Sequence, residues 1–229
     1  MVVDLNTSEN KVASLLGRYM PTAISIRIMP SHDADSILPN LVYDEELMIN
    51  ALLAPVRPRN ATDVDADFYK KVIQVLQTTH DVVILVLPND YLHPLSKMSF
   101  EVSDEILVVT TLATTNVEMM SRALTEFFTS TSVGGLAIQR NKVGIVANMV
   151  VANVGMGKEK LLRASLGAPL VGQIPAEYEA VLSVANGNHL GELLNHERLG
   201  VAYNKLAISC IPSLASNSNI FKIYLEIKN

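Results

Sequence analysis

The sequence has no tryptophan, a single cysteine, and few aromatic residues, which make up 5% of its 229 positions. Cys210 cannot form a disulfide within the chain, so we expect a protein of a reducing compartment. Positive charge is also scarce, since 18 Lys and Arg stand against 23 Asp and Glu and give a net charge of −5. Without a basic surface, and with few aromatic side chains to stack on bases, no nucleic-acid partner is expected.

Long apolar runs are missing as well. No run approaches the roughly 18 residues that a membrane-spanning helix needs, and the N-terminus lacks the pattern of a secretory signal. Hydrophobic residues nevertheless make up 49% of the chain, which excludes a disordered or low-complexity protein. We therefore expect a cytoplasmic globular protein with a single domain over residues 1–229, in which residues 201–229 form a C-terminal extension of unassigned structure.

What the sequence does contain is an alternation of short apolar runs with helical patterns. Runs rich in β-branched residues predict strands buried on both faces, and helices between them predict an α/β fold with a mostly parallel sheet. The pattern leaves residues 22–40 unassigned, and Phe221–Lys228 fits a strand better than a helix. The predicted strands are Val2–Val3, Leu47–Leu53, Val82–Leu87, Ile106–Val109, Val143–Ala147 and Leu170–Ile174, and the predicted helices are Phe68–Leu76, Val117–Phe128, Lys158–Leu166, Glu177–Ala185 and Leu190–Leu194.

Several segments share their order and spacing with one known family. They are Met1–Gly17, Leu52–Arg59, Asp81–Asn89, Ser103–Thr111, Lys142–Met149, Gly167–Pro175 and Val184–Gly187. Together they resemble the MinD/ParA-type ATPases, and most of all the CpaE/TadZ branch, which serves in pilus assembly and polar localisation. The resemblance implies a P-loop NTPase-type fold of three layers, which binds ATP at the carboxyl ends of its strands and often dimerises face to face.

The family's phosphate-binding loop, K-G-G-x-G-K-T, comes before the segment that Met1–Gly17 matches. We therefore expect the first strand, P-loop and helix of the family fold to be lacking here, either because the chain is a fragment or because it never had them.

The resemblance also marks positions where the nucleotide chemistry is degraded. Val86 stands where the family has the Walker B-type aspartate that helps to hold Mg²⁺, and valine offers no oxygen to a hard cation. Asp90 stands where a glycine usually lets the backbone approach the γ-phosphate. Asn6 replaces the second acid at the end of the first strand, which leaves Asp4 alone. These changes imply a site that does not hydrolyse ATP.

A residual base site is implied by the second half of the chain. In the family, the asparagine that Asn148 matches reads the adenine edge, and the residues at Ile174, Pro175 and Glu177 frame the base. The alternative is that Asn148 ends a strand and Pro175 turns the chain, which any α/β protein needs. ATP or ADP bound without a productive Mg²⁺ site is the cofactor that the resemblance allows.

Two other patterns resemble ligand sites less closely. Gly155, Gly157 and Lys158 mimic a phosphate loop, but Glu159 stands where a Ser or Thr should meet Mg²⁺, so a loop before a helix start is the plainer interpretation. His189, Glu192 and His196 lie at helical spacing, but no HExxH motif or cysteine partner accompanies them, and we expect no metal site. No catalytic residue set is recognised.

The function that this resemblance implies is binding rather than catalysis. We expect a localisation or assembly factor that associates with itself or with an intact ATPase paralogue, and with proteins of pilus or secretion assembly. The family also implies peripheral membrane contact and a polar location. The alternative is a fragment of an active ATPase whose P-loop lies upstream of Met1.

Overall fold

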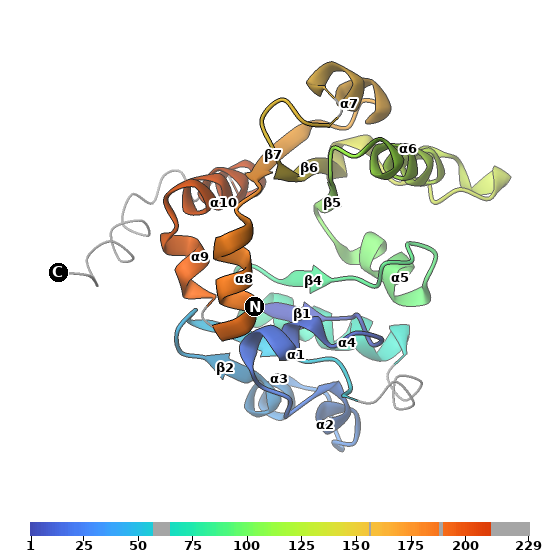
Figure 1. The fold of residues 1–229 in the computed structure, drawn as a ribbon. Coiled ribbons are helices and arrows are strands. Elements are labelled where there is room, and N and C mark those ends of the chain that lie inside the picture. Colours follow the sequence, from blue (N-terminus) through green and yellow to red (C-terminus); the bar gives the residue numbers. More distant parts are fainter. Residues whose placement is uncertain (57–64, 156, 188–189, 212–229) are drawn as a thin grey trace. The chain divides into compact units, whose positions relative to one another are not determined.

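The computed structural model describes residues 1–56, 65–155, 157–187 and 190–211 (Figure 1). Within them the chain forms two compact units. The first comprises Met1–Ser103 and Val184–Gly191, and the second comprises Asp104–Ser183 and the chain from Glu192 onward. The fold is α/β, with mostly parallel strands flanked by helices, as the alternating pattern predicts.

The first unit contains a four-stranded sheet in the order β2-β3-β1-β4. Strand β1 pairs in parallel with β3 on one side and with β4 on the other, and only β2 is antiparallel to its neighbour. The elements of this unit are β1 (Val2–Asp4), α1 (Lys11–Leu16), α2 (Ala23–Arg27), α3 (Ala34–Ile37), η1 (Leu38–Asn40), β2 (Val42–Asp44), β3 (Ile49–Leu52), α4 (Ala66–Thr79), β4 (Ile84–Val86) and α5 (Pro94–Val102).

Helix α4 shows how the sequence specifies this unit. Asp65 caps it by accepting a hydrogen bond from the Phe68 N–H at 2.9 Å. Its buried residues follow the helical repeat and pack in one core with Val3 and Leu5, which flank Asp4 in the chain. The helix is five residues longer than the apolar pattern of Phe68–Leu76, because capped and polar turns extend it at both ends.

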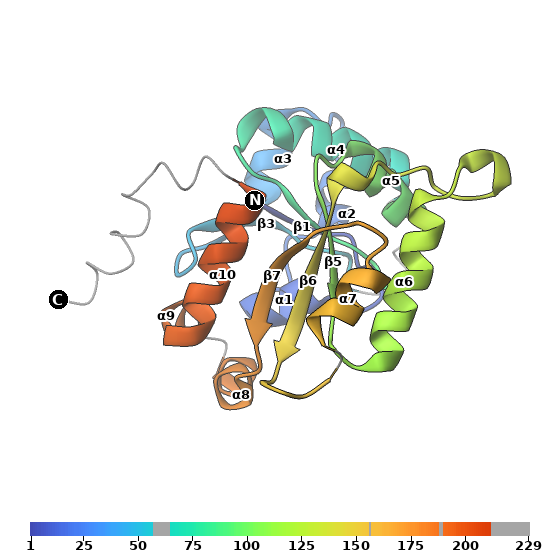
Figure 2. The same ribbon diagram turned by 90° about the horizontal axis from the view of Figure 1, so that it is seen from above.

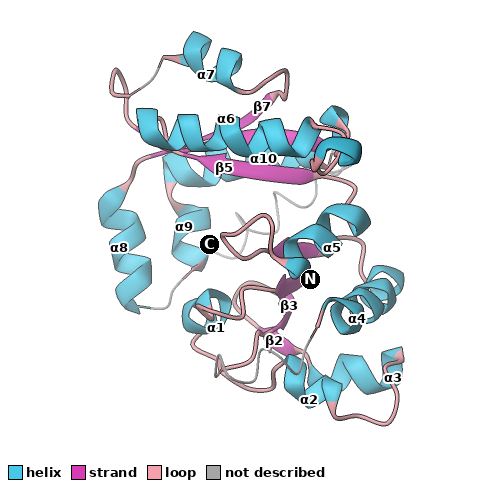
Figure 3. Ribbon diagram, turned by 90° about the vertical axis from the view of Figure 1, so that its right-hand side faces the viewer, coloured by secondary structure: helices cyan, strands magenta, loops and turns pink. Residues whose placement is uncertain are grey.

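The second unit contains a three-stranded parallel sheet in the order β5-β6-β7. Helix α6 contacts β5 and helix α10 contacts β7, and Figure 3 shows both helices running along this sheet. The elements are β5 (Ile106–Thr110), α6 (Thr114–Phe128), η3 (Thr131–Val133), η4 (Arg140–Lys142), β6 (Val143–Val150), α7 (Lys158–Ala164), β7 (Leu170–Pro175), α8 (Tyr178–Gly187), α9 (Gly191–Asn195) and α10 (Glu197–Cys210).

Strand β6 is the centre of this sheet, and its first five residues are buried, as an uninterrupted apolar run predicts. Its register with β7 shifts between Ala147 and Val150, and Met149 there has a φ of 54°. The bulge places Asn148 and Met149 at the carboxyl end of β6 with their side chains outside the regular pleat.

The differences from the predicted elements have local causes. The run Leu47–Leu53 forms a shorter strand, Ile49–Leu52, and pairs with β2, which is too short to show a strand pattern. Residues 22–40 form the short helices α2 and α3, held by Thr22 and Asp33 at their N-termini. The predicted extension 201–229 begins inside α10, while its remainder from residue 212, with the predicted strand Phe221–Lys228, lies outside the described residues.

Candidate functional site

The carboxyl ends of β1 and β4 bring Asp4 beside Val86. The two strands are parallel neighbours, and Asp4 is paired in register with Val86. The Asp4 side chain is fully buried, and burial raises the pKa of its carboxyl, an effect that the backbone N–H groups of Asn6 and Val12 partly offset. The Asn6 N–H donates to Asp4 Oδ1 at 3.0 Å. Asp4 therefore holds the start of the β1–α1 loop, and Val86, the residue paired with it on β4, contributes no side-chain oxygen.

Asn6 also serves this loop. Its side chain is nearly buried, donates from Nδ2 to Glu9 Oε2 at 3.2 Å and accepts from the Ser8 N–H at 3.4 Å. Glu9 Oε2 in turn lies 2.5 Å from Lys11 Nζ at the start of α1. The amide thus completes a turn between β1 and α1, as Asn side chains commonly do.

Asp90 lies in the segment between β4 and α5, and both its carboxylate and its main chain fix that segment. Oδ1 accepts from the Leu92 N–H at 2.8 Å. The Asp90 carbonyl accepts from Ser96 Oγ at 2.8 Å and from the His93 N–H at 3.2 Å. The bonds from Leu92 and His93 close a turn over residues 90–93, and the bond from Ser96 ties that turn to α5.

In the second unit, Asn148 lies in the bulge at the end of β6. It is half-buried, and its Oδ1 accepts from the Met149 N–H at 2.9 Å. Pro175 is paired with Val150 at the end of β7, and Ile174 is buried in the core beneath α10. These contacts fit the alternative in which Asn148 and Pro175 end their strands.

Glu177 follows β7 and forms an ion pair with Arg198 of α10. The pair joins the start of α8 to the first turn of α10. The Glu177 carboxylate is therefore paired with the Arg198 guanidinium of the same unit.

The glycines of the β6–α7 loop have different environments. Gly155 has a φ of +88°, and a Cβ on it would lie 2.7 Å from the Leu112 carbonyl oxygen. Gly157 has no heavy atom within 4 Å of the position of a Cβ, and it precedes Lys158 at the start of α7. Close packing against Leu112 therefore explains a glycine at position 155 without any bound phosphate.

The predicted site residues divide between the two units. Asp4, Asn6, Val86 and Asp90 lie at the carboxyl edge of the first sheet, whereas the remaining residues lie at the carboxyl edge of the second. Those in the second unit are Asn148, Gly155, Gly157, Lys158, Ile174, Pro175 and Glu177.

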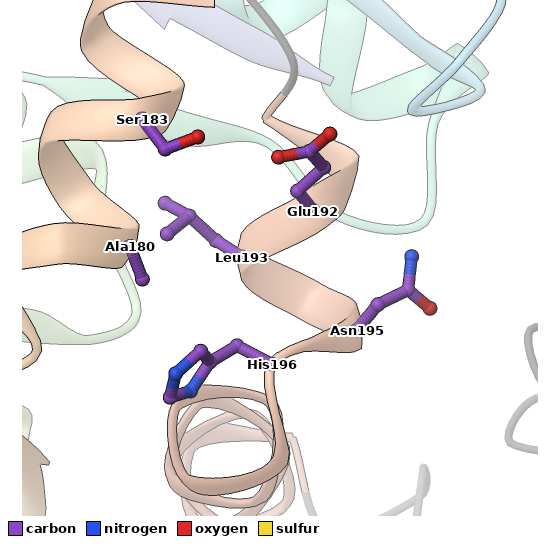
Figure 4. A pocket seen from close by; sticks show the side chains of 6 residues that line it. All are labelled: Ala180, Ser183, Glu192, Leu193, Asn195 and His196. Carbon is purple, nitrogen blue, oxygen red and sulfur yellow. The ribbon is translucent and has the colours of Figure 1, made fainter.

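A shallow pocket of about 330 Å³ lies between α8 and the α9–α10 turn (Figure 4). Its polar side chains come from Ser183, Glu192, Asn195 and His196, with Leu193 between them. His196 is engaged there, since its Nδ1 accepts from the Leu199 N–H at 3.4 Å. His189 lies outside the described residues, and within the described part of the chain no three His, Cys, Asp or Glu side chains gather as a metal site.

Sequence reasoning missed an apolar surface at the carboxyl end of the second sheet. Its residues have exposed fractions between 40% and 62% and come from the end of β6, the β6–α7 loop and α8. The two segments leave neighbouring strands, and the Ala176 N–H donates to the Val150 carbonyl between them (Figure 2). The spacing of the three α8 residues signals one helix face, but spacing alone does not separate an exposed face from a core face. We call this set the carboxyl-end patch: Met149, Val151, Val154, Tyr178, Val181 and Leu182.

None of the helices that the structure describes combines the length and apolarity needed to cross a bilayer.

No protein-family model and no curated protein matches the sequence. Solved structures do match the fold. The ParA family ATPase from Chlorobium tepidum TLS is 12% identical, with 91% of this chain and 83% of that chain covered and a TM-score of 0.74. The septum site-determining protein MinD of Pyrococcus horikoshii OT3, complexed with Mg-ADP, is 14% identical over 95% of this chain and 85% of its own, with a TM-score of 0.73. The MinC:MinD cell division protein complex of Aquifex aeolicus is 15% identical, with 92% of this chain and 82% of that chain covered and a TM-score of 0.71.

Proposed function

We propose that this protein is a MinD/ParA-like localisation or assembly factor that acts by binding other proteins and does not hydrolyse ATP. The observation that carries the proposal is the pairing of Asp4 with Val86 at the ends of two parallel strands. A Mg²⁺ site at this edge needs oxygen ligands, and here one strand ends in a valine. The acid on the other strand is buried and accepts a hydrogen bond from a backbone N–H.

The carboxyl-end patch supports a role in protein binding. Six apolar side chains exposed on neighbouring segments make a surface that water solvates poorly, and patches of this kind often mark contact sites. We propose that a second copy of the chain, or an intact ATPase paralogue, covers this patch. Because no phosphate is needed to bridge such a contact, the association is independent of nucleotide.

The narrower assignment rests on the sequence resemblance. The match to the CpaE/TadZ branch leads us to propose a role in pilus or secretion assembly, with a polar or membrane-peripheral location. Residual binding of ATP or ADP by Asn148, with Ile174, Pro175 and Glu177 framing the base, is compatible with this role.

The active-ATPase alternative rests on the acid that remains at Asp4. In that alternative a K-G-G-x-G-K-T loop encoded upstream of Met1 supplies the phosphate site. Codons for that loop within about 40 residues of Met1, the length of a strand-loop-helix unit, would favour it. Calorimetry with ATP and ADP on the full gene product, with and without Mg²⁺, tests the two directly. Binding that strengthens with Mg²⁺ supports the alternative, and binding that ignores Mg²⁺ or is missing supports our proposal.

The binding role is tested by light scattering and by pull-down with the paralogue. Leu182→Glu places a charge in the carboxyl-end patch and should abolish association. Val133→Glu is the matched control, because Val133 is 75% exposed in the same unit but belongs to η3, which follows α6. A chain that is monomeric at high concentration and captures no paralogue would refute the proposed contact, as would equal effects of the two substitutions.

A further inference from the structure

Helices α5 and α10 both begin at a histidine. His93 precedes α5, and its Nδ1 accepts a hydrogen bond from the Leu95 N–H at 3.2 Å. His196 precedes α10, and its Nδ1 accepts from the Leu199 N–H at 3.4 Å. The residues that usually cap helices in this way are Ser, Thr, Asp and Asn, whose oxygens stay acceptors at neutral pH. The sequence contains five histidines, so two of them hold this uncommon position.

A histidine cap differs from the usual ones because the acceptor can be lost. Nδ1 accepts only when it carries no proton, so each hydrogen bond assigns the neutral tautomer with its proton on Nε2. An imidazolium has N–H groups at both nitrogens and cannot accept. Its positive charge would also lie at the positive end of the helix dipole, where cations are unfavourable.

We infer that His93 and His196 make the N-termini of α5 and α10 sensitive to pH, because the neutral imidazole caps each helix and the imidazolium releases it. The inference is independent of the proposed function. For α10 the release loosens the helix that covers β7, where Leu206 packs over Gly172. For α5 it frees the end of the segment that Asp90 holds.

Charged side chains lie near each histidine. Glu192 lines the same pocket as His196, Glu197 and Arg198 follow it on α10, and Arg198 is paired with Glu177. The facing wall of α8 supplies Ala180 and Ser183, which carry no charge.

The other histidine has Asp90 before it in the same segment and Lys97 one turn later on α5. Helix α4 packs against α5 and contributes Lys70, which is paired with Glu101 at the far end of α5.

The test replaces each histidine with a cap that does not titrate. His93→Asn and His196→Asn, alone and together, keep an acceptor at the N-cap from about pH 7.5 to about pH 5.5. Over this range the unfolding equilibrium constant of the wild-type chain should rise about fivefold per histidine more than that of the matching variant, since losing one cap typically has this effect. His196→Ala, which has no acceptor at the N-cap, should be less stable than His196→Asn at both pH values.

His80→Asn is the control. His80 lies at the C-terminus of α4 with Nδ1 3.3 Å from the Leu76 carbonyl oxygen, where a protonated ring can still donate, so acid removes no N-cap here. This variant should be at least as acid-sensitive as the wild-type chain. A double variant that is as acid-sensitive as the wild type would overturn the inference.

Imidazole nitrogen resonances of the wild-type chain give a second measurement, which does not depend on any variant folding. At about pH 7.5 both His93 and His196 should carry the proton on Nε2. A proton on Nδ1 of either ring at this pH would overturn the inference for that helix.

Discussion

The backbone of Gly155 lies against the carbonyl of Leu112, so close that a Cβ on Gly155 would be 2.7 Å from the Leu112 oxygen and 2.8 Å from its Cβ. Leu112 follows β5 and Gly155 follows β6, so the contact joins the loops at the carboxyl ends of two neighbouring strands. The glycine that makes this loop resemble a phosphate site is therefore required by packing within the protein.

Gly155→Ala should destabilise the second unit by about 1–3 kcal/mol, because alanine is strained at a φ of +88° and its Cβ meets the Leu112 backbone. Gly157→Ala should change stability far less, since open space surrounds the Cβ position and its φ is −63°. Urea unfolding of the two variants makes the comparison. Equal losses would show that the loop depends on its glycines in some other way.

The stability of the first unit should depend on pH through Asp4. Its pKa is raised from 3.8 by burial, so the folded state binds a proton more readily than the unfolded state does. The free energy of unfolding therefore falls as the pH rises from about 3.8 through the raised folded-state pKa, and the destabilisation persists at higher pH. Asp4→Asn should flatten this part of the stability curve, as followed by urea unfolding at several pH values. An unchanged slope in the variant would assign the dependence to other groups.

The 229-residue chain should show no Mg²⁺-dependent ATP hydrolysis above background. Losing one group that stabilises the transition state typically costs ~10²–10³ in rate. The proposed function places Val86 at the position of the acid that would help to hold Mg²⁺, so at least one such group would be lost. A phosphate-release assay with and without EDTA measures this. Turnover that EDTA abolishes and that Lys158→Ala removes would show that Lys158 serves a phosphate site.

Hydrogen exchange over Leu87–His93 should be the same with and without ATP. Asp90 and Ser96 hold this segment by bonds within the protein, so nucleotide has nothing to order there. Ser96→Ala removes one of these bonds and should speed exchange at His93 without making it respond to ATP. A rise in protection on adding ATP would mean that the segment still senses nucleotide, and it would contradict the proposed function.

The architecture was predictable where long patterns decide it. The strands at Ile106–Val109, Val143–Ala147 and Leu170–Ile174 and the helix over Val117–Phe128 are confirmed, because buried runs and a strong helical repeat leave little choice. The sequence pattern does not predict strand β2 or helices α2 and α3, which the structure contains. They have three to five residues each, and their stability comes from capping bonds and strand pairing rather than from a repeat.

The site was predictable only in part. The sequence could place Asp4 and Val86 near strand ends, but only the structure shows that they are paired neighbours. It could not show that Asp90 ties its own segment to α5, since the partners are a hydroxyl and backbone groups whose positions depend on the turn. Nor could it show the carboxyl-end patch, because the exposure of Leu182 depends on which face of α8 meets the core.

The turn at Asp90 also bears on timing. Hydrogen bonds to the Asp90 carboxylate and carbonyl stabilise one arrangement of this segment, whereas a two-state switch needs a second arrangement for a ligand to select. Under the proposed function, the chain would not time its own association through a nucleotide-driven switch. The onset and the lifetime of its complex would then depend on the concentration of the chain and on the turnover of its protein partner.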